Sequence, residues 1–66
     1  MSILKVIELL GSSEKSWEDA AQSMIDEASK TVKNIRSIYI QDMSASVKDN
    51  KIKEYRVNGK VTFEVR

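Results

Sequence analysis

The chain has 66 residues and contains neither cysteine nor histidine. It must therefore hold a small fold together without a disulfide and without a metal site built on sulfur or imidazole. In a domain of this size the gain from apolar burial and the loss of conformational entropy are each on the order of 100 kcal/mol and nearly cancel. Small domains commonly make up the difference by oligomerisation or by binding a metal. We therefore expect one domain over residues 1–66 that assembles with copies of itself.

Charge and hydropathy exclude several classes of function. Eleven Lys and Arg residues against ten Asp and Glu residues leave a net charge of +1, which gives no electrostatic basis for binding nucleic acid. No apolar run is long enough to span a membrane, and the N-terminal residues do not follow the pattern of a secretory signal. The serines have no histidine to activate them as nucleophiles. We expect a cytoplasmic protein that is not an enzyme.

Apolar periodicity predicts a strand followed by a helix. Residues 2–10 form an aliphatic run rich in β-branched side chains, which Gly11 is expected to end. Residues 17–33 place their apolar side chains on one stripe at helical spacing. Ser16 is the predicted N-cap of this helix, and Asp19 completes a capping box in which Asp replaces Glu.

Two further strands are predicted over residues 34–47 and 52–66, joined at the turn signal Asp49–Asn50. The last strand shows the clearest alternation in the chain. Gly59 falls on its apolar parity, where it marks either a bulge or a close approach of the helix to bare backbone. The expected fold class is α+β, with the order β-α-β-β and a three-stranded antiparallel sheet wrapped around one helix.

The first strand is apolar on both of its faces. A strand of an open antiparallel sheet normally keeps one wet face, and a single helix can cover only one side. The open edges of such a small sheet also need cover. Both features predict that a neighbouring copy of the chain packs against this sheet.

Acidic side chains gather around the predicted helix start. Glu14, Glu18 and Asp19, with nearby hydroxyl and carbonyl oxygens, are the hard ligands that Ca²⁺ prefers. The same residues are equally expected at a helix N-terminus, where carboxylates complement the helix dipole. The spacing alone favours this capping role and leaves a metal site open.

Two further features have alternative readings. Trp17 lies on the apolar stripe, so it anchors the helix onto the sheet or onto a neighbouring chain, or else stacks on a ligand. A polar ladder follows one face of the last strand, with polar side chains of the preceding strand beside it. This ladder is either a solvated face, or a polar surface between subunits or the lining of a cavity; its members are Arg56, Asn58, Lys60, Thr62 and Glu64, flanked by Ser37, Tyr39 and Gln41.

Taken together, the order, length and spacing of several runs resemble the dodecin family over essentially the whole chain. These runs are residues 5–13 (KVIELLGSS), 16–21 (SWEDAA), 32–36 (VKNIR) and 55–63 (YRVNGKVTF). The resemblance implies a β-α-β-β protomer in a hollow homododecamer built from four trimers. It also implies a protein that binds or stores a small ligand or cation.

The dodecin pattern further implies a flavin pocket with a stacking Trp and a hydrogen-bonding Gln. In this chain the Trp position carries Ser37 and the Gln position carries Arg56. Ser37, Gln41 and Arg56 thus mark the positions near that pocket, with residue types altered. Loss of the stacking ring should remove most of the flavin affinity, so flavin storage with an altered pocket is the alternative hypothesis.

The chain is most similar to the calcium dodecin branch of this family. Ser-Trp-Glu at residues 16–18, Ile-Arg at 35–36 and Tyr-Arg at 55–56 carry this likeness. The leading hypothesis is therefore a Ca²⁺-binding shell, with Glu18 as the first candidate ligand and Glu14 and Asp19 beside it. A purely structural assembly without a specific ligand is the third hypothesis.

Overall fold

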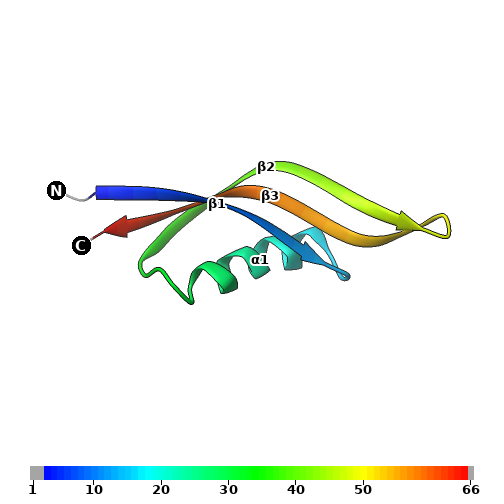
Figure 1. The fold of residues 1–66 in the computed structure, drawn as a ribbon, viewed down its shortest axis with the longest axis horizontal. Helices are drawn as coiled ribbons and strands as arrows, with labels where there is room; N and C mark the ends of the chain where they lie inside the picture. Colours follow the sequence, from blue (N-terminus) through cyan, green and yellow to red (C-terminus); the bar gives the residue numbers. More distant parts are fainter. Residues whose placement is uncertain (1–2, 66) are drawn as a thin grey trace.

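The computed structural model describes residues 3–65 as three strands and one helix. The elements are β1 (Ile3–Ser13), α1 (Trp17–Ala28), β2 (Ile35–Lys48) and β3 (Lys51–Val65). The three strands form one antiparallel sheet in the order β1-β3-β2, with α1 packed against one of its faces (Figure 1). The predicted fold class and the pairing of the first strand with the last are confirmed.

The first strand is longer than predicted, and Gly11 does not end it. β1 continues through Ser13, which pairs with Tyr55 of β3. The role of Gly11 is to let the helix approach. A Cβ at this position would collide with the backbone carbonyl of Ala20 and lie 2.6 Å from Cγ of Met24. The chain therefore leaves the sheet two residues later than its glycine suggests.

The helix begins at Trp17, with Ser16 as its N-cap in extended conformation, as predicted. Its C-terminal end was predicted wrongly, because α1 stops at Ala28 instead of residue 33. The carbonyl of Ala28 accepts hydrogen bonds from the amides of Thr31 and Val32, which closes the last turn. Both of these residues are β-branched and disfavour helix. Val32 still packs against the core from the following turn.

The β2–β3 hairpin turns at Asp49–Asn50, where the turn was predicted. Both residues have positive φ, 53° and 64°, as a two-residue type I′ turn requires. β2 is irregular in register at three places, one of them between Ile40 and Asp42, opposite Gly59. Gly59 is thus the predicted bulge site, and the close approach there comes from β2, because a Cβ would meet the carbonyl of Tyr39.

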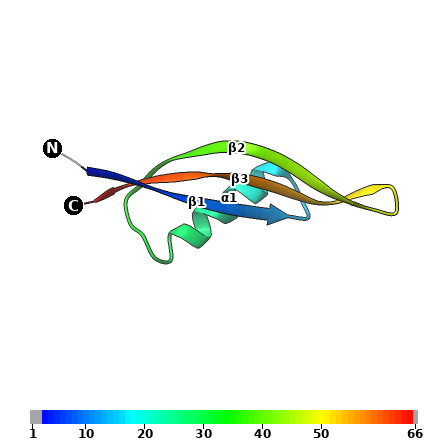
Figure 2. The same ribbon diagram turned by 45° about the horizontal axis from the view of Figure 1, so that its top comes forward.

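The core lies between the helix and the sheet and is small. Its fully buried members are Ala20, Met24 and Ala28 of α1 with Val57 and Val61 of β3. The alanines let the helix sit close to the sheet. Seen at another angle, the strands twist over the helix, and the β2–β3 hairpin extends well beyond it (Figure 2). Within residues 3–65, no helix is long and apolar enough to cross a membrane.

Candidate functional site

The acidic segment at the helix start forms a hydrogen-bonded corner between β1 and α1. The Ser13 hydroxyl donates to Oδ2 of Asp19 at 2.6 Å and accepts from the Lys15 amide at 2.9 Å. The Asp19 amide donates to Oγ of Ser16 at 3.0 Å. Asp19 therefore joins the end of the strand to the first turn of the helix. The predicted N-cap role of Ser16 is confirmed, but the Asp19 carboxylate accepts from Ser13 instead of completing the predicted capping box with the Ser16 amide.

Ser13 is the residue of this corner whose burial was not predicted. Its side chain is buried, although the strand was expected to end at Gly11. The signal was present in the alternation, because Ser13 shares the parity of Ile7, Leu9 and Gly11, which face the helix. Extending β1 by one more alternation would have placed its hydroxyl next to Asp19.

The three predicted metal ligands lie at this corner, but they do not form a metal cluster by themselves. Glu14, Glu18 and Asp19 are all exposed. Among the described residues, no three acidic side chains come close enough together to hold an ion. Ca²⁺ takes about 6–8 oxygen ligands, so one copy of the chain can supply only part of such a site. Their role as ligands stays a prediction.

The altered flavin positions are exposed, and α1 does not cover them. Ser37 pairs with Thr62, and Arg56 pairs with Ser44, so both lie along the polar ladder. Thr62 and Arg56 are six residues apart on β3, which corresponds to roughly 20 Å along a strand. Gln41 is the extra residue of the bulge opposite Gly59. A ligand that touched all three positions would therefore need a second copy of the chain.

Trp17 anchors the helix onto the sheet. Its ring meets that of Tyr55 edge-to-face, with centroids 4.9 Å apart and an interplanar angle of 73°. Tyr55 also pairs with Ser13 across the sheet, so the aromatic contact adjoins the polar corner. One of the predicted roles for Trp17 is thus confirmed, and the contact holds the helix start against β3.

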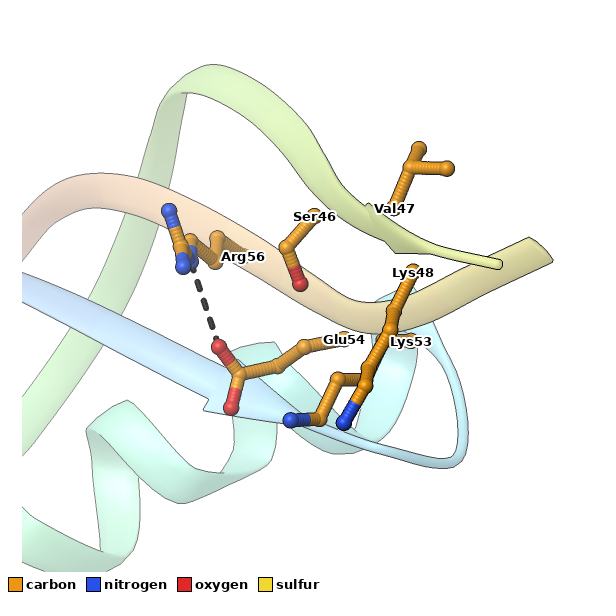
Figure 3. Close-up of a pocket in the computed structure, with 6 residues that line it drawn as sticks. All are labelled: Ser46, Val47, Lys48, Lys53, Glu54 and Arg56. Carbon is orange, nitrogen blue, oxygen red and sulfur yellow. Dashed lines mark hydrogen bonds and ion pairs between the residues drawn. The ribbon is translucent and has the colours of Figure 1, made fainter. Parts of the chain in front are cut away.

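A pocket of about 310 Å³ lies on the hairpin (Figure 3). It was not among the predicted sites, and its lining comes from β2 and β3 on either side of the Asp49–Asn50 turn. Arg56 is the one member singled out beforehand. The lining residues are Ser46, Val47, Lys48, Lys53, Glu54 and Arg56.

Comparisons with known proteins agree on one family. The Dodecin family model matches residues 3–66. A curated calcium dodecin of Mycobacterium tuberculosis is 33% identical over all 66 residues and over 93% of its own length. A Thermus thermophilus dodecin variant superposes with a TM-score of 0.94 at 27% identity, covering 100% of this chain and 98% of that one. The crystal structure of the M. tuberculosis protein, described as calcium-chelating, has a TM-score of 0.83 at 35% identity, with coverage of 98% and 93%.

Proposed function

This chain belongs to the dodecin family, and on that premise we propose that it forms a hollow dodecamer of four trimers that binds and stores Ca²⁺. The observation that carries the calcium part is the 33% identity to a calcium dodecin over the full length of this chain. The relative is named for its ion, and Ser16–Glu18 of this chain lies at a corner with exposed carboxylates. The proposed protein is a binding and storage shell, without catalysis.

The shape of the single chain supports assembly. Its accessible surface is 5050 Å², whereas a compact monomer of this mass exposes roughly 4,300 Å². Part of the excess is apolar, because Leu4, Val6 and Leu10 on the outward face of β1 are 58%, 55% and 70% exposed. The outer edges of β1 and β2 carry no partner strand among the described residues. Contiguous apolar surface and open strand edges are features that neighbouring copies cover.

The acidic corner connects Ca²⁺ binding to the assembly of several chains. One chain contributes exposed carboxylates at the β1–α1 corner but too few of them to fill a calcium coordination sphere. We propose that copies related by the symmetry of the shell bring such corners, or a corner and another acidic surface, together around the ion. Glu18 is the first candidate ligand, because its carboxylate is exposed and makes no hydrogen bond within the described residues.

Native mass spectrometry before and after dialysis against a chelator tests both parts. We expect twelve times the chain mass, with excess mass that the chelator removes and added Ca²⁺ restores. A bare dodecamer would contradict the calcium part, and a monomer would contradict the shell. Excess mass equal to flavin, with quenching of riboflavin fluorescence, would favour the alternative flavin-storing function.

Calorimetric titration with Ca²⁺ then tests the assigned ligand. Glu18→Gln removes a charge from the corner and should weaken Ca²⁺ binding by about tenfold or more, since charged oxygen ligands set the affinity of such sites. Glu27→Gln is the matched control, because Glu27 is exposed on the same helix and pairs with Lys30 at 2.8 Å, away from the corner. Equal affinities for the two variants would rule out Glu18 as a ligand.

A further inference from the structure

The end of the β2–β3 hairpin is a two-stranded arm, formed by residues 46–54. β1 reaches only as far as Tyr55, so beyond this point the two strands pair with each other alone. The arm carries three lysines against Asp49 and Glu54, and its register places Lys48 directly opposite Lys51. Like charges directly opposite each other destabilise a strand pair. The pairing of Lys48 with Lys51 therefore costs stability, and a bound anion would reduce the repulsion between the two lysines.

The pocket lies along this arm and gathers three cations and one carboxylate. Lys48 and Lys53 extend to the same side of the hairpin and both line the pocket, whereas Val47 projects away from them (Figure 3). Lys48 pairs with Lys51, and Lys53 lies two residues further along β3, so ordinary alternation places both lysines on one face. The register shift between Ser46 and Val47 then adds Glu54 to that same face. The lining therefore has two more positive charges than negative ones.

The hydrogen-bonding groups of the pocket are largely free for a ligand. Nε of Arg56 donates to Oε1 of Glu54 at 3.2 Å, which fixes the guanidinium beside the pocket. No hydrogen bond within residues 3–65 engages its two terminal nitrogens, the ammonium groups of Lys48 and Lys53 or the hydroxyl of Ser46. Guanidinium and ammonium groups converging on one volume are the donors that bind phosphate oxygens.

We propose that this arm pocket binds a small phosphate-bearing anion. The charge excess of the lining matches a dianion, which favours a phosphate over a single carboxylate. The volume of about 310 Å³ is at the small end of ligand pockets, which span roughly 300–1,000 Å³, so it suits a pyrophosphate or a short phosphate ester. The pocket shares no lining residue with the acidic corner, although Arg56 pairs with Ser12 next to it, and the proposal does not depend on the proposed Ca²⁺ function.

Calorimetric titration with inorganic pyrophosphate tests the proposal. It uses the assembled, chelator-treated protein in buffer without divalent cations, because pyrophosphate would itself bind Ca²⁺. We expect saturable binding that weakens as salt is raised, since salt shortens the range of charge interactions. The double variant Lys48→Gln/Lys53→Gln should lose about tenfold or more in affinity, because it removes two charge-assisted donors.

Lys33→Gln is the matched control, since Lys33 is exposed and belongs to the segment between α1 and β2. That segment lies at the end of the molecule opposite the hairpin turn (Figure 1). The Lys33→Gln protein should bind pyrophosphate like the parent. Absence of saturable binding at millimolar pyrophosphate, or unchanged affinity in the double variant, would overturn the proposal. Malonate is a dianion of similar size without phosphorus, and its binding as tightly as pyrophosphate would overturn the assignment to phosphate.

Discussion

The sharpest test of the packing concerns Gly59, where two physical effects have opposite signs. Gly59 is buried in the middle of β3, opposite the bulge of β2. In an ordinary strand, replacing glycine by alanine stabilises by about 0.5–1 kcal/mol, because alanine loses less backbone entropy on folding. Here an added Cβ would collide with the carbonyl oxygen of Tyr39. The sign of the change in stability therefore decides between propensity and packing.

The magnitude follows from what must move. The obstacle is a main-chain carbonyl held in the β2–β3 ladder, so it cannot swing aside as a flexible side chain would. Inserting extra carbon atoms into a well-packed site costs about 1–3 kcal/mol, which outweighs the gain in propensity. Gly59→Ala should therefore lower the free energy of unfolding by about 1–2 kcal/mol. Gly59→Val, with two more methyl groups, should cost more and weaken assembly as well.

Urea unfolding followed by circular dichroism measures this effect at one fixed protein concentration, because the stability of an oligomer depends on concentration. Lys60→Ala is the control, since Lys60 is exposed, adjoins Gly59 and should change stability by no more than about 0.5 kcal/mol. A Gly59→Ala protein as stable as the parent, or more stable, would refute the reasoning that backbone contact fixes this glycine.

Three smaller predictions concern the joints between elements, each measured as the urea midpoint of the variant against the parent. Trp17→Ala should lower the free energy of unfolding by about 2 kcal/mol, because it removes half-buried apolar surface and the edge-to-face contact with Tyr55. Trp17→Phe should recover much of this loss. Equal losses in the two variants would contradict the anchoring role. Ser16→Ala should cost about 1 kcal/mol by removing the N-cap acceptor of the Asp19 amide, and an unchanged midpoint would show that the cap is redundant. Arg36→Ala should cost at most about 1 kcal/mol, because the 2.6 Å pair of Arg36 with Glu64 is partly exposed; a loss that persists at high salt would contradict an electrostatic origin.

The sequence predicted the order of elements, the β2–β3 hairpin and the N-terminal start of the helix, because each rests on a local signal. Alternation in β3, the helical stripe of α1 and the Asp49–Asn50 turn do not depend on distant residues. The error at Gly11 arose where a tertiary contact overrides the local signal, whereas the helix end after Ala28 reflects the local preference of the β-branched Thr31 and Val32. By its type alone, Gly11 predicts the end of a strand, but in the structure its bare backbone contacts Ala20 and Met24 of the helix.

The sites were predictable only as far as they are local. Capping by Ser16 follows from the local sequence, whereas the bond of the Asp19 carboxylate to Ser13 from the end of β1 does not. The arm pocket escaped notice, because a register shift between Ser46 and Val47 brings Glu54 onto the face that already carries Lys48 and Lys53. Such a shift changes which side chains share a face, and alternation in one strand does not reveal it.

The acidic corner and the exposed face of β1 together explain why ion and assembly should depend on each other. A lone chain leaves both incomplete, since Leu4, Val6 and Leu10 are uncovered and the carboxylates at the corner are too few to enclose Ca²⁺. A ligand that binds only the assembled form stabilises it by about 2.7 kcal/mol when present at about one hundred times its Kd. If the ion lies between copies, its removal should therefore lower the concentration-dependent stability of the shell. If each ion were held within one chain, chelation would lower the stability of the fold without changing its dependence on protein concentration.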